Sequence, residues 1–170
     1  MRILGIDPGT AVTGFGVIED GRPPRALEYG AIRTPAGMQE AQRLARIHAR
    51  VQELITALSP DVLAVEQVFF NKNIQSALAV GQARGVVLLC AAQRGIPVHE
   101  YTPLEIKLAV TGQGRADKRQ VGYMIRTLLG LEAVPRPDDV ADALAVAVTC
   151  LQTLTTQRRW QMGTGRGVPG

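Results

Sequence analysis

The sequence predicts an α/β fold in which helices flank a mixed five-stranded sheet, and three observations support this fold class. The first third of the chain contains three short apolar runs separated by tight breaks, which is typical of antiparallel strands. Two more short apolar runs alternate with helical patterns, which favours parallel crossovers. The remaining residues carry helical patterns.

The first three strands are expected at residues 2–7, 13–19 and 26–33. The first ends in a polar turn, and the Gly-Arg-Pro-Pro segment at 21–24 separates the second from the third. Because such short connections join neighbouring strands, these three strands are expected to form antiparallel hairpins.

A helix is expected next, because apolar residues recur at three- and four-residue spacing up to Leu58. Ser59 and Pro60 end that helix. A short buried strand follows at 61–66, and a crossover can place it parallel to the first strand.

A long helix is expected at 73–94, ended by Gly95, with a last short strand at 97–100. Two further helices are expected to begin at capping boxes, because a side chain that can cap is followed three residues later by Glu or Gln. These pairs are Thr102 with Glu105 and Asp117 with Gln120.

The final helix is expected to begin at Asp138 or Asp139 and to carry residues 141–154. The end of the chain is rich in glycine and has no core pattern. We therefore assign residues 1–157 to one domain and expect residues 158–170 to form a disordered tail.

Composition favours a cytoplasmic globular protein. No apolar run approaches the roughly 20 residues that span a bilayer, so no membrane association is expected, and the first residues lack a signal-peptide pattern. The net charge of +4 is compatible with a polyanionic partner but does not require one. Cys90 and Cys150 lie in apolar helical patterns, so we expect buried, reduced thiols.

Four carboxylates stand where predicted strands end or a predicted helix begins. Asp7 closes the first strand and Glu66 closes the fourth. Asp139 and Asp142 are three residues apart at the start of the last helix, so they share one face. If the first and fourth strands are parallel neighbours, the helix can bring all four carboxylates together.

Clustered carboxylates repel one another unless cations neutralise them, and Mg²⁺ and Mn²⁺ prefer oxygen ligands. Two such ions about 3.5–4 Å apart can activate water and stabilise the departing 3′ oxygen in phosphodiester hydrolysis. We therefore predict that the four carboxylates are metal ligands and catalytic residues. The alternative is structural: Asp7 would be a turn residue, and the acidic residues from 138 to 142 would cap a helix.

Aromatic and basic residues suggest contact with nucleic acid. Phe69 lies close to Glu66 and to Lys72, and an exposed aromatic side chain beside a basic residue can stack on an unpaired base. Basic residues of the second half can neutralise phosphates, and they are Lys107, Arg115, Lys118 and Arg119. The alternatives are core packing for the aromatic residue and a solvated face for the basic ones.

The long helix carries small residues four apart, at Ala77, Gly81 and Gly85. Glycine costs up to about 1 kcal/mol against alanine inside a helix, so a packing reason is expected. The stripe would pack either on the sheet or on the same helix of a second subunit across a two-fold axis.

Other chemistry is not indicated. His48 and His99 are isolated, although His99 or a lysine remains open as a general base. The sequence contains no arrangement typical of a nucleophilic triad, and the Gly5–Thr10 segment fits neither the Walker nor the dinucleotide-binding pattern.

Several stretches match a known family in order and position: ILGIDPGT with VTGFGVI, AVEQVFF with KN, SALAVGQARG, and DDVADALAVAVT. On these stretches the chain resembles the RuvC family of bacterial Holliday junction resolvases over nearly its whole length. The resemblance implies a ribonuclease H-like fold, a homodimer and a two-metal site for Mg²⁺ or Mn²⁺.

The resemblance also implies roles for single residues. It makes Asp7, Glu66, Asp139 and Asp142 the metal ligands, although alignment can slip by one between Asp138 and Asp139. It further implies contacts with DNA and between subunits, which involve Phe69 near the junction centre, Lys107 and Lys118 in the DNA groove, and the helix with Gly81 and Gly85 at the dimer interface.

For the activity, the resemblance implies paired symmetric nicks in a four-way DNA junction, which leave 5′-phosphate and 3′-hydroxyl ends in homologous recombination and DNA repair. The implied partners are RuvA and RuvB, which branch-migrate the junction. The alternatives are a junction-binding protein without catalysis, another ribonuclease H-like nuclease, and an actin-like kinase, which would need a far longer chain.

Overall fold

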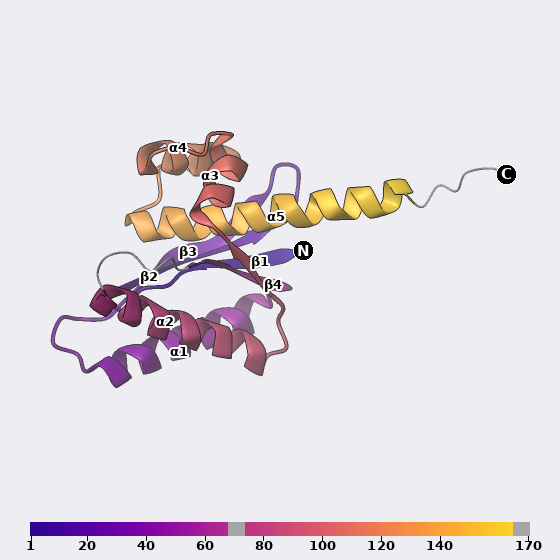
Figure 1. Cartoon of the computed structure of the whole chain (residues 1–170). Helices are drawn as coiled ribbons and strands as arrows, with labels where there is room; N and C mark the ends of the chain where they lie inside the picture. The colour runs from indigo at the N-terminus through magenta and orange to yellow at the C-terminus, as the bar shows by residue number, and fades with distance from the viewer. Residues whose placement is uncertain (68–73, 165–170) are drawn as a thin grey trace.

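The computed structural model describes residues 1–67 and 74–164 of the 170-residue chain. Five strands and five helices of these residues form the fold (Figure 1). In chain order they are β1 (Arg2–Asp7), β2 (Val12–Glu19), β3 (Arg25–Arg33), α1 (Glu40–Leu58), β4 (Val62–Glu66), α2 (Ile74–Gln93), β5 (Val98–Tyr101), α3 (Pro103–Thr111), α4 (Lys118–Leu128) and α5 (Asp138–Thr164).

The strands form one mixed sheet in the order β3-β2-β1-β4-β5. β1 pairs with β2, and β2 with β3, in antiparallel fashion, as the short connections predict. β4 lies parallel to β1 on one side and to β5 on the other. The crossover that the sequence left open therefore does place the fourth strand beside the first.

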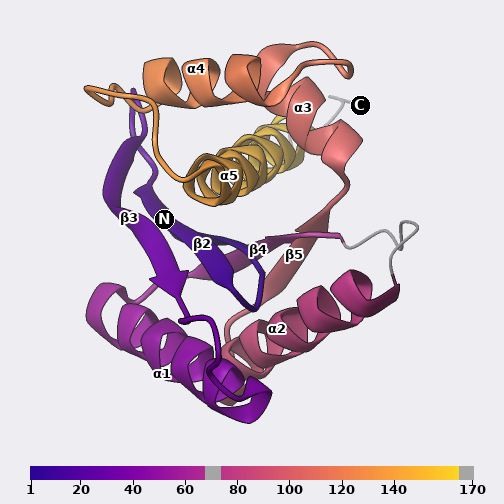
Figure 2. The ribbon, with the colours of Figure 1, turned by 90° about the vertical axis from the view of Figure 1, so that its left-hand side faces the viewer.

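Helices cover both faces of the sheet (Figure 2). α1 and α2 lie on one face, while α5 lies on the other and is itself covered by α3 and α4. Successive side chains of β1 alternate between the two cores: Leu4 and Ile6 join the α1–α2 side, and Ile3 joins the α5 side. The sheet is thus buried on both faces.

Helix α5 approaches the sheet very closely because glycines face it. A Cβ on Gly5 would overlap the backbone oxygen of Ala143, and a Cβ on Gly14 would overlap that of Asp139. The backbone of α5 therefore rests directly on β1 and β2. This contact fixes where the first turn of α5 lies relative to the end of β1.

The local signals at the helix ends are confirmed. Both capping boxes are present, at Thr102 with Glu105 and at Asp117 with Gln120. α1 ends at Ser59, which adopts a left-handed conformation before Pro60.

The end of the chain differs from the prediction. α5 continues through Thr164, so residues 158–164 are helical rather than part of a disordered tail. A pattern of buried residues cannot signal this extension, because the side chains of residues 156–161 are exposed. Residues 165–170 lie outside the described part, and the assignment of residues 1–157 as the domain stays a prediction.

Both cysteines are buried free thiols, as expected, and burial raises the pKa of each thiol above its ordinary value. Within residues 1–67 and 74–164, none of the helices combines the length and the apolar character needed to cross a lipid bilayer.

Candidate active site

Asp7 and Glu66 end neighbouring parallel strands and point to the same face of the sheet. Side chains two apart on a strand share a face, so Asp7 lies on the α5 side with Gly5, and Glu66 lies there with Ala64. The β1–β4 register pairs Ile6 with Val65, one step before the two carboxylates. The sheet therefore presents both carboxylates side by side.

Helix α5 brings the other two predicted ligands to this place. Gly14 pairs with Asp7 in the β1–β2 ladder, and the backbone of Asp139 rests on Gly14. Asp142 lies almost one turn further along α5, on the same face. Three elements that are distant in the sequence thus bring Asp7, Glu66 and Asp142 to one cavity, which Asp139 does not line, although its charge acts on Asp7.

Neighbouring carboxylates raise the pKa values of Asp7 and Glu66. Burial is the largest cause that raises the pKa of Asp7 from its ordinary value of 3.8 to about 7. The negative charges of Asp142, Glu66 and Asp139 add to this rise of the Asp7 pKa. Burial and the charge of Asp142 also raise the pKa of Glu66. The cluster therefore holds more negative charge than its surroundings neutralise.

Lys107 and Lys118 line a cavity with three of the carboxylates. Lys118 Nζ donates a hydrogen bond to Asp142 Oδ2 at 2.9 Å, and this contact raises the pKa of Lys118. The positive charges of Lys118 and Lys107 oppose the rise in the pKa of Glu66. Both lysines line a cavity of about 310 Å³ together with Asp7, Glu66 and Asp142, and Ile106 and Val121 supply its apolar wall.

The donor set fits a hard divalent cation, because it consists of carboxylate oxygens in a partly desolvated cavity. In the described part of the chain, no three acidic, histidine or cysteine side chains already enclose a point where a metal ion would sit. Lys118 instead holds one oxygen of Asp142. Binding of a cation at Asp142 therefore requires Lys118 to move away or to share that carboxylate.

The two adjacent aspartates differ in their surroundings. Asp138 forms an ion pair with Arg136, which the sequence analysis did not single out. Asp139 acts on the pKa of Asp7, whereas Asp138 is not among the groups that shift it. The only signal for Arg136 in the sequence is its position as a basic residue two places before Asp138.

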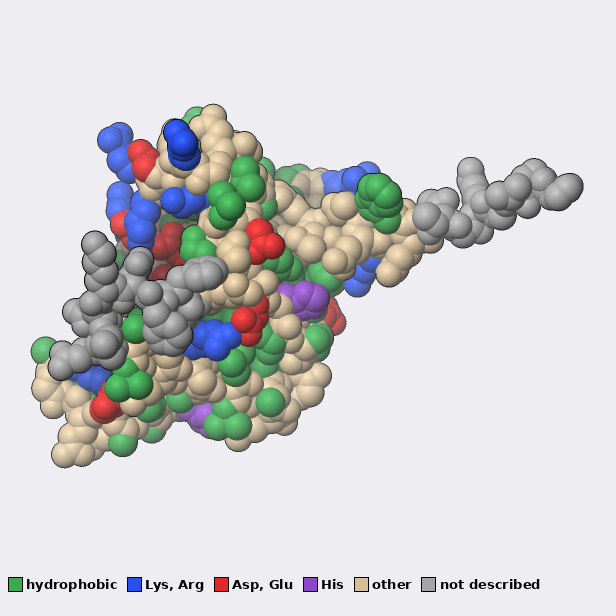
Figure 3. All heavy atoms as spheres, in the orientation of Figure 1, with side chains coloured by type: hydrophobic (Ala, Val, Ile, Leu, Met, Phe, Trp, Pro, Cys, Tyr) green, Lys and Arg blue, Asp and Glu red, His purple; other side chains and the backbone are tan. Residues whose placement is uncertain are grey.

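The remaining predicted DNA contacts lie partly near this cavity. Arg119 lines two neighbouring cavities with Arg136, while Arg115 is exposed and does not line the acidic cavity. Figure 3 shows basic side chains gathered over α3 and α4, around recessed acidic side chains. Phe69 and Lys72 lie outside the described residues.

The small-residue stripe of α2 does not pack on the sheet. Gly81 and Gly85 are exposed, and a Cβ on either would meet no described atom within 4 Å. Ala77 is half-buried, and the neighbouring Leu78 and Leu89 are exposed. Of the two packing partners that the sequence allowed, the sheet is therefore excluded for these glycines.

The histidines lie away from the carboxylates. His48 Nε2 is 3.1 Å from Gln93 Oε1, which joins α1 to the end of α2. His99 pairs with Ala64 in the β4–β5 ladder and does not line the acidic cavity. Neither arrangement indicates a role in catalysis.

Comparisons with known proteins agree with this architecture. The sequence model of the family described as crossover junction endodeoxyribonuclease RuvC matches residues 3–150. A protein of that description from Moorella thermoacetica is 63% identical over 149 residues, which cover 87% of this chain and 89% of that protein. Another from Heliobacterium modesticaldum is 56% identical and covers 91% of this chain and 96% of its own.

Solved structures give the same result. T. thermophilus RuvC in complex with a Holliday junction substrate superposes with a TM-score of 0.86 at 39% identity, covering 92% of this chain and 96% of that one. The yeast mitochondrial resolvase Ydc2, with a TM-score of 0.66 at 12% identity, covers 93% of this chain and 82% of its own and supports the fold alone. The ribonuclease H-like fold is confirmed, and the chain belongs to the RuvC family of crossover junction endodeoxyribonucleases.

Proposed function

We propose that this protein is a metal-dependent endonuclease that resolves four-way DNA junctions. The observation that carries the proposal is the half-buried carboxylate of Asp7, whose pKa is raised to about 7 by burial and by the charges of three further carboxylates. A cluster of this kind is costly for folding unless a cation neutralises it. Family membership supports junction DNA as the substrate.

The residues that would hold the metal are Asp7, Glu66, Asp139 and Asp142, and we propose two ions of Mg²⁺ or Mn²⁺. When bound, such ions neutralise the phosphate and activate water for hydrolysis. The oxygen-only donor set supports a hard cation over a soft one. Among the two adjacent aspartates, the ion pair of Asp138 with Arg136 supports Asp139 as the ligand.

The chain's own side chains position the DNA. Lys107 and Lys118 line the cavity and would contact the scissile phosphate or its neighbours. Ile106 and Val121 form an apolar wall that limits the access of bulk water. Cleavage of the bond to the 3′ oxygen leaves 5′-phosphate and 3′-hydroxyl ends.

Further contacts would extend along the DNA. Arg119, beside the acidic cavity, and Arg115, in the exposed α3–α4 connection, would neutralise backbone phosphates. Phe69 is proposed to stack near the junction centre and Lys72 to contact the backbone, and both proposals rest on the sequence alone.

The proposed functional unit is a homodimer that pairs through α2. The exposed glycines of α2 and the neighbouring exposed Leu78 and Leu89 support a close helix contact. A two-fold dimer presents two equivalent sites to a two-fold junction, which supports paired nicks. By family resemblance, RuvA and RuvB would move the junction to these sites. The free thiols support a cytoplasmic location.

The proposal is tested with an Asp7→Asn variant on a synthetic mobile four-way junction in Mg²⁺ or Mn²⁺. Loss of the carboxylate charge is expected to reduce cleavage more than about a hundredfold while junction binding persists. The readout is mapped products on all four strands, with binding measured in EDTA. Full cleavage by the variant would contradict the assignment of Asp7 as a metal ligand.

Parallel digests of a four-way junction and of an RNA–DNA hybrid distinguish the proposed resolvase from a non-catalytic binding protein and from another ribonuclease H-like nuclease. A non-catalytic junction-binding protein would bind the junction but leave it intact in every metal. A nuclease for RNA–DNA hybrids would degrade a hybrid faster than the junction. We expect paired nicks in the junction and no comparable digestion of the hybrid.

A further inference from the structure

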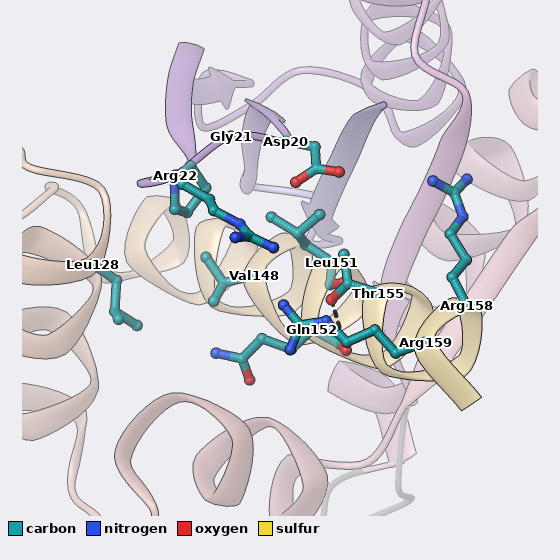
Figure 4. A pocket seen from close by; sticks show the side chains of 11 residues that line it. Asp20, Gly21, Arg22, Leu128, Val148, Leu151, Gln152, Thr155, Arg158 and Arg159 are labelled. Carbon is teal, nitrogen blue, oxygen red and sulfur yellow. Dashed lines mark hydrogen bonds between the residues drawn. The ribbon is translucent and has the colours of Figure 1, made fainter. Parts of the chain in front are cut away.

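A second cavity lies further along α5 than the acidic one. It has a volume of about 410 Å³ and opens between the C-terminal half of α5, the turn that joins β2 to β3, and the end of α4 (Figure 4). Arg159 at this cavity is 17 residues beyond Asp142 along α5, or about 25 Å at a helical rise of about 1.5 Å per residue. This hairpin–helix pocket is lined chiefly by Asp20, Arg22, Leu128, Val148, Leu151 and Arg159.

The floor of the hairpin–helix pocket is apolar. Val148 and Leu151 of α5 are buried at its base, and Leu128 from the end of α4 closes one side. A concave apolar floor of this size is typical of pockets that bind a ligand rather than of an ordinary surface groove. It favours an occupant that carries at least one apolar group.

Arginines outnumber the one carboxylate, Asp20, among the charged residues of the pocket, and two of these arginines lack ion-pair partners among the described residues. Arg22 from the hairpin and Arg159 from α5 reach toward the same space in Figure 4. Neither forms an ion pair or a side-chain hydrogen bond with any residue that the structure describes. The neighbouring Arg25, in contrast, pairs with Glu19 at 3.1 Å. The unpaired guanidinium groups favour a ligand with carboxylates.

Both features together point to a protein segment rather than to DNA. A DNA backbone offers phosphates but no apolar group that would fill a cavity over Val148 and Leu151. The last residues of this chain, 165–170, contain Arg166 and no acidic residue, so they lack charge complementarity. An acidic peptide with one apolar side chain satisfies both the floor and the rim.

We propose that the hairpin–helix pocket docks a short acidic segment of a partner protein. One apolar side chain of that segment sits on Val148 and Leu151, and its flanking carboxylates bind Arg22 and Arg159. This inference does not depend on the nuclease function, because the pocket and the acidic cavity share no lining residue.

The test selects from a displayed library of random ten-residue peptides on the immobilised full-length protein. The expected consensus is an apolar residue flanked by Asp or Glu. Binding of a labelled consensus peptide, measured by fluorescence polarisation, is expected to weaken at least about tenfold in R22E/R159E. R22K/R159K is expected to retain most binding, and replacement of the apolar residue of the peptide by Ala is expected to weaken it.

The matched control is Arg46→Glu, which reverses an exposed arginine on α1, on the other face of the sheet. It is expected to leave peptide affinity unchanged, and circular dichroism verifies that each variant is folded. Selection without an acidic–apolar consensus would overturn the proposal. Equal peptide affinity of R22E/R159E and the unaltered protein would also overturn it. If R22E/R159E lost affinity for the junction but not for the peptide, these arginines would be assigned to DNA binding instead.

Discussion

Asp7 is a half-buried carboxylate whose pKa is raised to about 7. Its backbone is held in place by the β1 ladder and by the contact of α5 with the sheet, so its carboxylate stays close to the other acidic residues. Folding therefore forces together charges that repel. A cation or a proton must compensate, and this competition makes both stability and metal binding depend on pH.

Without metal, the free energy of unfolding should fall as pH rises. The pKa of Asp7 is 3.8 in its ordinary state and about 7 in the folded protein, so between these values the folded state binds more protons than the unfolded one. Stability is therefore highest near pH 4 as far as this group is concerned, and it declines toward pH 7 by up to about 4 kcal/mol. Denaturant unfolding in EDTA across this range measures the decline.

Asp7→Asn supplies the control for that experiment, because an amide does not titrate. The variant should show a flatter dependence on pH and, in EDTA at pH 7.5, a higher melting temperature than the unaltered protein. Mg²⁺ or Mn²⁺ should stabilise the unaltered protein more than the variant. A dependence on pH that is the same in both proteins would remove Asp7 as its cause.

The adjacent aspartates allow a matched pair of substitutions. Asp139→Asn is expected to reduce cleavage more than about a hundredfold, because it removes a proposed metal ligand whose charge also acts on Asp7. Asp138→Asn should retain activity within about tenfold, because Asp138 pairs with Arg136 on the surface. The measurement compares the initial cleavage rates of the two variants on one junction at saturating metal. The reverse ranking would shift the ligand to Asp138.

Among the secondary-structure elements, α5 and the sheet depend on each other through glycine. In Gly14→Ala, the added methyl group would overlap the backbone oxygen of Asp139. We expect a loss of about 1–3 kcal/mol in the free energy of unfolding, and a larger loss of cleavage than of junction binding, because the first turn of α5 shifts. Urea unfolding and cleavage rates measure the two effects.

The same methyl group at Gly85 is the control for stability. Gly85 lies in α2 with no described atom within 4 Å of an added Cβ, so at concentrations where the protein is monomeric Gly85→Ala should not lower the free energy of unfolding. Higher helix propensity would instead raise it by up to about 1 kcal/mol. If Gly14→Ala were as stable as Gly85→Ala, the close approach of α5 would not matter.

Local patterns were sufficient to predict most elements. The capping boxes at Thr102 and Asp117 depend on residues three apart, so the sequence contains them in full. The shared face of Asp7 and Glu66 follows from alternation along strands once these are known to be parallel neighbours.

Pairing over long distances was not predictable. The contact between Lys118 and Asp142 joins residues 24 apart through the packing of α4 on α5, and no local pattern encodes it. The extension of α5 to Thr164 also went unnoticed, since a mostly exposed helix end lacks an apolar stripe.

The protein as a whole separates three surfaces. The acidic cavity lies where β1, β4 and the start of α5 meet, and the hairpin–helix pocket lies at the other end of α5. The exposed stripe of α2 lies on the opposite face of the sheet from α5 (Figure 2). A dimer through the exposed stripe of α2 would therefore leave the hairpin–helix pocket of each subunit accessible, so the proposed peptide contact does not compete with assembly.

Assembly should be required for paired cleavage but not for folding. Gly81→Arg places a long charged side chain on the exposed stripe of α2, where an added Cβ meets no described atom within 4 Å. The variant should remain folded but sediment as a monomer at concentrations where the unaltered protein is a dimer. A supercoiled plasmid with an extruded cruciform should then be converted mainly to nicked circles, because the second nick is no longer made within the same complex. The unaltered protein should yield linear plasmid, and a Gly81→Arg variant that does so while monomeric would show that one subunit suffices.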